Sequence, residues 1–388
     1  MRIGIDIRVL QEGSGGVYVY AHQLLQHLIP LAARHQLQLF ANQYHARGDR
    51  AIQELARHKN VTLHQYRFPN RLLNASLRFL RWPQIDQLVS GCEVLFFPSM
   101  MYAAWSDDVR IVTTMHDLSF EYFPELFTRK QQIWHWLVNP RNLCERSKRV
   151  IAVSASTKRD VADRYQEVDA RKISVVHSGV SDQFRPVVDR RELSRARKKY
   201  RLPDARFCIQ VGTLEPRKNH LLTLEAFNRW HAEYSSEAKN VHLIFAGHCG
   251  WKWSALRRAI SQSPFRDKVH VITDFSAVDL PSLYSLAIFS IYPSLYEGFG
   301  FPILESMSCG VPVITAANSS LGEVAGDAGL LINPYRIDDA LAAIRRVAGD
   351  PDFAKILRAR GLARSATFGW DKCAVETLRV LEQAARSS

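Results

Sequence analysis

The stretch that decides the fold is Tyr292-Pro-Ser-Leu-Tyr-Glu-Gly-Phe-Gly-Phe-Pro-Ile-Leu-Glu-Ser-Met-Ser-Cys-Gly-Val-Pro-Val-Ile314. The apolar run Ile288–Tyr292 predicts a buried strand, and a glycine-rich turn follows at Gly298–Gly300. Pro302 opens the next apolar segment, a position where proline suits the first turn of a helix. A strand, a glycine loop and a helix in this order form the repeating unit of parallel sheets whose two faces are covered by helices.

The same alternation runs through most of the chain. The predicted strands of the first half are Ile3–Val9, Leu37–Phe40, Val94–Phe97, Ile111–Met115, Arg149–Val153 and Ile173–Val176. Those of the second half are Phe207–Val211, Val241–Phe245, Val269–Ile272, Ile288–Tyr292, Val311–Thr315 and Leu330–Ile332. The charged segment Asp182–Asp204 interrupts the pattern and predicts a linker followed by a basic helix.

Helices are predicted between these strands, and an amphipathic one at the end of the chain. The predicted helices are Val17–Leu31, Arg190–Tyr200, Leu221–Tyr234, Trp253–Ile260, Leu280–Ser285, Pro302–Ser308 and Trp370–Ala385. We therefore expect two doubly wound α/β domains in tandem. Because open parallel sheets bind ligands beyond the carboxyl ends of their strands, the cleft between two such domains is the expected site.

Composition limits the class of protein. The chain has 388 residues, 47% hydrophobic and 23% charged, which excludes a disordered chain, a collagen-like repeat and a small disulfide scaffold. Its length suits two or three domains. The 51 Lys and Arg outnumber the 38 Asp and Glu, giving a formal charge of +13 that favours anionic partners such as phosphorylated metabolites, nucleic acid or acidic lipids.

The cysteines and the hydrophobic pattern predict a cytoplasmic protein. Six cysteines occur without any CxxC pair, which indicates reduced thiols rather than disulfides or structural zinc. Met1–Val9 places charges inside a strand pattern and does not resemble a signal peptide. No window reaches the roughly 18 consecutive apolar residues of a spanning helix, so any membrane contact is expected to be peripheral, at the inner face.

The two glutamates of the deciding stretch suggest two contacts on a long polar ligand. Glu297 and Glu305 are eight residues apart, on the order of 12 Å along a helix. The paired carboxyls of a retaining glycosidase lie only about 5–5.5 Å apart, so these two do not fit that role. Carboxylates accept hydrogen bonds from hydroxyls, and backbone amides at a helix start can hold phosphate.

Taken whole, Tyr292–Ile314 resembles the glutamate-x7-glutamate motif of family 4 glycosyltransferases, which have the GT-B fold. Further segments agree with the family in order: Gly15-Gly16, His116-Asp117, Val153–Ser156, Gly179-Val180, Gly212–Asn219, Ala246-Gly247 and Phe368-Gly-Trp370. The resemblance covers nearly the entire chain. It implies two Rossmann-like domains and a returning helix: residues 1–183 bind the acceptor, 184–367 bind the nucleotide-sugar, and 368–388 form a helix that crosses back to the first domain.

The resemblance also assigns the donor site. It implies that Glu305 binds the ribose and Glu297 the transferred sugar, and that Gly298, Phe299 and Gly300 place their amides beside sugar and phosphate. Val211–Asn219 supplies the second signal, because a strand there ends in Gly212 and delivers two cations to the edge of the sheet. Fixed cations stabilise the charge that collects on a departing diphosphate.

Those two cations are Arg217 and Lys218. Lys218 matches the lysine of the family. The family commonly places an arginine directly after the glycine, where this chain has Thr213. Arg217 is expected to supply that guanidinium, as in the Glu-Pro-Arg-Lys-Asn subgroup that the segment resembles, so its assignment is weaker than that of Lys218.

The first domain contributes four further candidates. Gly15 and Gly16 join a strand to a helix, and the matching glycines of the family approach the donor diphosphate. The matching histidine contacts the donor sugar, which assigns that role to His116, while Asp117 orients the ring or touches the acceptor. Read from the residues alone, the glycines suit a plain turn equally well, and a single histidine is more often structural.

The implied activity is a retaining hexosyl transfer. The resemblance implies a front-face route in which the departing phosphate oxygen takes the proton of the acceptor, with no cofactor and no metal. The Glu-Pro-Arg-Lys-Asn subgroup is similar to bacterial mannosyl- and rhamnosyltransferases of polysaccharide assembly, which favours GDP-mannose as donor and a saccharide or polyprenyl-linked saccharide as acceptor. A UDP-sugar or another nucleotide-sugar stays open. A phosphorylase or epimerase, and a basic nucleic-acid-binding protein supported by charge alone, are the alternatives.

Two stretches combine basic and aromatic residues. Arg71–Trp82 interleaves arginines with apolar residues at helical spacing, and Phe127–Val138 contains Trp134 and Trp136. Such segments can lie on an anionic membrane, and they can equally pack an apolar side into a domain core. Both fall in the half expected to bind the acceptor.

Overall fold

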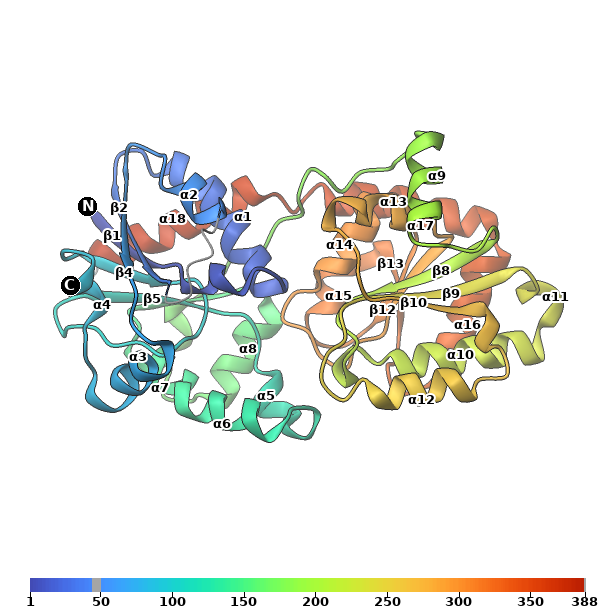
Figure 1. The fold of residues 1–388 in the computed structure, drawn as a ribbon, viewed down its shortest axis with the longest axis horizontal. Helices are drawn as coiled ribbons and strands as arrows, with labels where there is room; N and C mark the ends of the chain where they lie inside the picture. The colour runs from blue at the N-terminus through green and yellow to red at the C-terminus, as the bar shows by residue number, and fades with distance from the viewer. Residues whose placement is uncertain (44–49, 387–388) are drawn as a thin grey trace. The chain divides into compact units, whose positions relative to one another are not determined.

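The computed structural model describes residues 1–43 and 50–386. The chain divides into two compact units, drawn in Figure 1. Unit 1 comprises Met1–Gly179 and Gly369–Ser388, and unit 2 comprises Val180–Phe368. The sequence analysis placed the boundaries at residues 183 and 368.

Unit 2 contains a six-stranded sheet in which every pair of neighbours is parallel. The order is β10-β9-β8-β11-β12-β13, so the chain starts at the centre and winds outward in both directions. The strands are β8 (Arg206–Val211), β9 (Val241–Ala246), β10 (Val269–Ile272), β11 (Phe289–Tyr292), β12 (Val313–Ala316) and β13 (Gly329–Ile332).

Both faces of this sheet are buried because successive side chains of a strand point to opposite faces. In β8, Cys208 joins the core beneath α10 and α16, whereas Phe207 and Ile209 join the core beneath α13. The helices of unit 2 are α9 (Arg190–Lys199), η5 (Pro216–Lys218), α10 (His220–Glu233), α11 (Ser235–Ala238), α12 (Ser254–Gln262), η6 (Arg266–Lys268), η7 (Ala277–Asp279), α13 (Leu280–Leu286), α14 (Phe301–Ser308), α15 (Ser319–Ala325), η8 (Gly326–Ala328), α16 (Ile337–Gly349) and α17 (Pro351–Ser365).

Unit 1 repeats the plan with a seven-stranded parallel sheet of order β3-β2-β1-β4-β5-β6-β7. Its strands are β1 (Arg2–Asp6), β2 (Gln36–Asn42), β3 (Val61–Tyr66), β4 (Val94–Phe97), β5 (Arg110–Met115), β6 (Arg149–Ala152) and β7 (Ile173–Val175). Its helices are η1 (Arg8–Glu12), α1 (Gly16–Leu31), α2 (Arg50–Leu55), α3 (Asn70–Ala75), η2 (Ser76–Leu80), α4 (Ile85–Leu88), α5 (Ser119–Tyr122), η3 (Pro124–Leu126), α6 (Arg129–Val138), α7 (Pro140–Arg146), α8 (Ala155–Arg164), η4 (Ala170–Lys172) and α18 (Trp370–Arg386). The predicted pair of doubly wound parallel sheets is confirmed.

The last helix, α18, packs in unit 1 against α1 and strands β4, β5 and β6. Trp370 and Leu381 are among its buried residues, and the Trp370 ring meets that of Tyr20 at 6.1 Å. Polar contacts add to this packing, since His27 bonds Asp371 and His35 bonds Glu382. The C-terminal segment is thus an integral part of the core of unit 1.

The structure differs from the predicted elements at several places. The first strand ends at Asp6 instead of Val9, because Arg8 turns back to form a buried, bidentate ion pair with Asp6. Strand β3 was not predicted, since it lies at the sheet edge and alternates half-buried with exposed residues. Helices α16 and α17 were also missed.

The cysteines and helices bear on the expected compartment. All six cysteines are free, and four of them are buried. Within residues 1–43 and 50–386, no helix combines the length and apolar character needed to cross a membrane.

The join between the first segment of unit 1 and α18 provides a test of the fold. A Cβ on Gly179 would lie 2.4 Å from the Trp370 backbone nitrogen and 2.7 Å from the carbonyl carbon of Gly369. Because backbone cannot move aside cheaply, Gly179→Ala is expected to lower the unfolding free energy by about 1–3 kcal/mol in urea titrations. Gly349→Ala is the matched control, since a Cβ there meets nothing within 4 Å. Equal stabilities for the two variants would contradict this packing.

Candidate functional site

The site in unit 2 lies where the two central strands end. β8 and β11 are hydrogen-bonded neighbours, so the loops that follow them leave the same edge of the sheet. The loop after β8 contains Gly212 and η5, and the loop after β11 leads through Glu297 to α14. A backbone bond of 2.8 Å from Leu295 N to the Arg217 carbonyl ties the two loops together.

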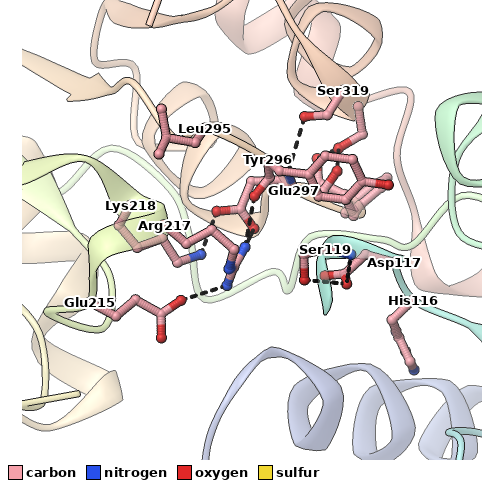
Figure 2. Close-up of polar contacts among 12 residues, drawn as sticks. His116, Asp117, Ser119, Glu215, Arg217, Lys218, Leu295, Tyr296, Glu297 and Ser319 are labelled. Atoms are coloured by element: carbon pink, nitrogen blue, oxygen red, sulfur yellow. Dashed lines mark hydrogen bonds and ion pairs between the residues drawn. The ribbon is translucent and has the colours of Figure 1, made fainter. Parts of the chain in front are cut away.

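A buried ion-pair cluster joins these loops (Figure 2). Lys218 Nζ lies 2.5 Å from Glu297 Oε1, and Arg217 Nη1 lies 2.8 Å from Glu297 Oε2, so each carboxylate oxygen faces its own cation. Arg217 Nη2 also bonds Glu215 Oε1 at 2.8 Å. The Tyr292 hydroxyl lies 2.6 Å from Lys218 Nζ and donates to Glu297 Oε1 at 3.0 Å.

The electrostatics of the cluster fix the charge of Glu297. Its burial alone would raise the pKa, but Arg217 and Lys218 more than offset that effect and lower the pKa to about 2. The Glu297 carboxyl is therefore ionised near neutral pH and can only accept hydrogen bonds. Burial lowers the pKa of Lys218, an effect that Arg217 reinforces and Glu297 opposes. Burial raises the pKa of Glu215, against the pull of Arg217.

Two glycines permit the backbone beneath the cluster. Gly212 has φ +147°, which disfavours other residues, and an added Cβ would lie 3.5 Å from the Tyr292 ring. Gly247 follows β9 and leaves no room at all, because a Cβ there would meet the Gly212 carbonyl oxygen at 1.8 Å. The backbone at Gly212 therefore packs directly against Gly247. The same loop continues to Arg217 and Lys218 at the carboxyl edge of the sheet.

The glycine loop after Glu297 is held by α15. Ser319 Oγ accepts from Glu297 N at 3.0 Å, and the Ser320 hydroxyl donates to the carbonyls of Glu297 and Phe299 at 2.8 and 3.0 Å. The Phe299 side chain is buried, and its ring meets that of Phe368 at 5.9 Å. Gly300 takes φ +103° directly before α14 begins.

Glu305 lies within α14 and has a different environment from Glu297. Its Oε2 accepts from the Tyr284 hydroxyl at 3.0 Å. Burial raises its pKa to about 7, and the bond from Tyr284 offsets only part of that effect. Near neutral pH a hydroxyl pair of a ligand would therefore favour the ionised form, because hydroxyls donate to a carboxylate.

In unit 1, His116 follows β5 directly. Its Nε2 lies 2.9 Å from the Pro98 carbonyl, which can only accept, so Nε2 carries the proton and Nδ1 is an acceptor when the ring is neutral. Burial lowers the pKa of His116, so the ring is neutral near pH 7. The Tyr20 ring of α1 meets the imidazole edge-on at 4.8 Å and fixes its orientation.

The remaining candidates of unit 1 have structural contacts. Asp117 accepts from Ser119 N at 2.9 Å and from the Ser119 hydroxyl at 2.7 Å, so it holds the first residue of the short helix α5 (Figure 2). Gly15 takes φ +96° at the start of α1, and Gly16 is the first residue of that helix. A Cβ on Gly15 would meet nothing within 4 Å, so the requirement for glycine here is conformational.

The structure thus gathers Gly212, Arg217, Lys218 and Glu297 into one cluster, and places Gly298–Gly300 and Glu305 on the loop and helix that follow. The sequence analysis did not assign roles to four contacting residues: Glu215, Tyr284, Tyr292 and Ser319. Glu215 and Tyr292 lie within the two stretches, Val211–Asn219 and Tyr292–Ile314, from which the donor site was predicted. The two adjacent cations Arg217 and Lys218 could have indicated Glu215, because buried cations need carboxylate partners. Tyr284 and Ser319 come from other segments and gave no local signal.

The edge of this sheet brings together two cations, Arg217 and Lys218, and the ionised carboxylate of Glu297, just before the start of α14. The helix itself adds the Glu305 carboxyl, which titrates near neutral pH. Such a set suits a ligand that carries hydroxyls at two places and negative charge between them. In the part of the chain that the structure describes, no group of three or more His, Cys, Asp and Glu could hold a metal ion.

Comparison with protein families matches both halves of the chain. Residues 14–184 match Glycosyltransferase Family 4, and residues 194–364 match Glycosyl transferases group 1.

Individual relatives agree. The chain is 32% identical over 269 residues to O-antigen chain mannosyltransferase B of Escherichia coli, covering 69% of each protein. It is 29% identical to the serotype-specific mannosyltransferase WbdA of the same species, where the match covers 68% of this chain but only 32% of that protein. The solved sucrose-phosphate synthase of Thermosynechococcus elongatus is similar over the full length of both chains, with a TM-score of 0.76 at 18% identity. The predicted GT-B fold is confirmed.

The Glu305 carboxyl gives a pH-dependent test of the site. Its folded pKa of about 7 exceeds the value of 4.5 expected in the unfolded chain, so between these values the folded chain binds more protons than the unfolded chain. Stability from this group is therefore full below about pH 4.5 and is lost as pH rises through about 7. Relative to Glu305→Gln, the wild type should lose on the order of 2–3 kcal/mol of unfolding free energy between pH 5 and 8 in urea titrations.

Glu225→Gln, which removes an exposed carboxyl on α10, is the matched control and should keep the pH dependence of the wild type. A wild type and a Glu305→Gln variant with parallel pH profiles would show that Glu305 has an ordinary pKa.

Proposed function

The chain belongs to glycosyltransferase family 4, and we propose that it transfers a hexosyl group, with retention of anomeric configuration, from a nucleotide-sugar to a lipid-linked or oligosaccharide acceptor in cell-surface polysaccharide synthesis. The observation that carries this proposal is the cluster of Arg217, Lys218 and Glu297 at the carboxyl edge of the sheet of unit 2. In this proposal, the two cations correspond to the diphosphate of a nucleotide-sugar, and the carboxylate corresponds to the hydroxyls of its sugar.

Unit 2 is proposed to bind the donor. The ribose would lie on Glu305, whose carboxylate accepts from vicinal hydroxyls as the acidic residue of dinucleotide folds does. Lys218 and Arg217 would face the diphosphate, joined by the amides of Gly298–Gly300 at the start of α14. The support is the short bond network that holds Lys218 in place, because a donor that is fixed in advance loses little freedom on binding.

Glu297 is proposed to accept hydroxyls of the transferred sugar. A pKa of about 2 leaves no proton to give near neutral pH, which argues against general-acid catalysis by this residue. The two cations that hold it ionised are the same ones proposed to face the diphosphate. The Glu297 carboxylate would thereby orient the sugar beside its own leaving group.

The proposed chemistry follows from charge. As the bond between sugar and diphosphate breaks, negative charge collects on the departing oxygen, and Lys218 and Arg217 stabilise it. That oxygen then takes the proton of the acceptor hydroxyl on the same face of the sugar, so the new bond forms with retention. His116, neutral with an accepting Nδ1, is proposed to bind a donor-sugar hydroxyl.

Unit 1 is proposed to bind the acceptor, with Asp117 contributing a contact and Gly15 and Gly16 lying near the donor diphosphate. For the donor we propose GDP-mannose, on the support of relatives that are named mannosyltransferases. A UDP-sugar is the alternative, because base selection depends on the shapes of the surrounding loops.

A nucleotide panel tests the donor site. We expect one of GDP, UDP, ADP and dTDP, first GDP, to raise the melting temperature of the protein, because a ligand that binds only the folded state stabilises it by mass action. At about 100 times the dissociation constant, the gain is about 2.7 kcal/mol. The shift should be lost in Glu305→Ala and Lys218→Ala and kept in Glu225→Ala. No shift with any nucleotide at millimolar concentration would contradict the proposal.

We also propose peripheral contact with the inner face of the cytoplasmic membrane, through a face of unit 1 formed by η2 and α6. Phe79, Leu80 and Trp82 are exposed at the end of η2, and Trp136 is 72% exposed on α6, none of whose residues is buried. Leu77 of η2 packs into the core, but these other apolar side chains face solvent. Arg71, Arg78 and Arg81 lie among them, which suits anionic lipid.

Vesicle flotation tests this contact. The protein should float with vesicles containing phosphatidylglycerol and remain behind with neutral vesicles, because both apolar insertion and charge contribute to binding. The variant Leu80→Ser/Trp82→Ser/Trp136→Ser should lose flotation. A control that changes exposed apolar residues of unit 2, Val188→Ser/Val278→Ser, should keep it. Equal flotation of both variants would place the contact elsewhere.

A further inference from the structure

A small pocket in unit 1, which no part of the donor chemistry uses, lies between η2, α6 and α7. Its volume is about 90 Å³, several times the roughly 10–15 Å³ that one water requires. Typical cavities for organic ligands span about 300–1,000 Å³, so this one fits a compact group rather than a saccharide. Helices α3, α6 and α7 lie at the same end of unit 1 in Figure 1.

The lining of the pocket is strongly basic. Arg78, Arg81 and Arg146 all contribute, together with the polar Tyr102, Asn139 and Asn142, and none of the described residues that line it is Asp or Glu. Three guanidinium groups around so small a space repel one another. The pocket therefore has a net positive charge that its own walls do not neutralise.

Arg78 shows the consequence most directly. Its Nε is buried and has no hydrogen-bond partner among the described residues. A buried donor without a partner costs free energy, and proteins rarely keep one unless an ion, a water or a ligand satisfies it. Arg78 and Asn139 also line a neighbouring cavity, which Trp136 lines as well.

Arg146 shows the crowding of charge. Its guanidinium stacks on the Trp105 ring at 4.8 Å, which holds it in place. Burial lowers its pKa, and the positive charge of Arg81 lowers it further. Its guanidinium contacts the Asp107 carboxylate at 3.3 Å, but the Asp107 side chain is 92% exposed, where an ion pair contributes little.

We propose that this pocket binds a phosphate or diphosphate group through Arg78, Arg81 and Arg146. Guanidinium forks match phosphate oxygens and form charge-assisted hydrogen bonds with them, and a compact dianion would relieve the mutual repulsion of the three arginines. The partnerless Nε of Arg78 gains an acceptor in the same step.

The phosphate has two possible sources, a free phosphate or a phosphate that carries an apolar chain. The exposed side chains of Phe79, Leu80 and Trp82 stand next to the arginines in sequence and would cover such a chain. The binding of a phosphate group to this pocket does not depend on the proposed function. Only the assignment of that phosphate to the acceptor rests on the proposed function.

Calorimetric titration of the full chain tests the pocket. Inorganic diphosphate and geranyl diphosphate are the probes, at fixed ionic strength, with geraniol as the probe that lacks phosphate. Both diphosphates should bind the wild type, and Arg78→Gln and Arg146→Gln should each weaken that binding about tenfold or more, since each removes a charge-assisted bond. Tighter binding of geranyl diphosphate would identify the chain-bearing source, and equal binding the free phosphate.

Two controls separate this pocket from the donor site. Arg71→Gln removes an exposed arginine of α3 that does not line the pocket, and should bind both probes as the wild type does. Lys218→Gln, which alters the proposed donor site, should also keep the diphosphate binding that we assign to the pocket. Conversely, Arg78→Gln should keep the rise in melting temperature that the donor nucleotide causes. Retention of that shift also shows that Arg78→Gln is folded.

The proposal is overturned if neither diphosphate binds the wild type. It is equally overturned if binding is unchanged in both Arg78→Gln and Arg146→Gln, or is lost in Lys218→Gln alone. Each of these results leaves the donor site untouched, so a failure of the pocket is distinct from a failure of the proposed function.

Discussion

The contact of Lys218 with Glu297 is the constraint on which the site of unit 2 depends. A carboxylate this deeply buried needs a cation, and Lys218 and Arg217 supply two from the loop of the neighbouring strand. Removing one partner of a buried pair leaves an uncompensated charge at a cost of about 3–5 kcal/mol. The pair therefore does more than add stability, because it fixes the loop after β8 against the loop after β11.

The two glutamates show how environment divides one residue type into two roles. Glu297 and Glu305 belong to the same short stretch, yet cations lower the pKa of the first to about 2 and burial raises that of the second to about 7. The first is a permanent acceptor beside the cations. The second gains its charge near neutral pH, where a ligand with hydroxyl donors would hold it ionised. Together they make an elongated, polarised surface from one strand, one loop and one helix.

Much of this could be predicted from the sequence, for physical reasons. Buried parallel strands are short continuous apolar runs, so Val94–Phe97 was placed to the residue, whereas the half-exposed edge strand Val61–Tyr66 was missed. Arg217, Lys218 and Glu297 were named as candidates, but their direct pairing was not predicted. That pairing depends on the adjacency of β8 and β11, two strands that are far apart along the chain. The Tyr284 bond to Glu305 is likewise a tertiary contact without local signal.

The most direct test of the central claim compares the affinities of GDP and GMP by calorimetry. If Lys218 faces the second phosphate, the wild type should prefer GDP, and Lys218→Gln should bring the ratio of the two affinities close to one while GMP still binds. Glu305→Gln should weaken both nucleotides by a similar factor and keep their ratio, because the ribose is common to them. An unchanged preference for GDP in Lys218→Gln would contradict the account, since the diphosphate would then be held by other groups.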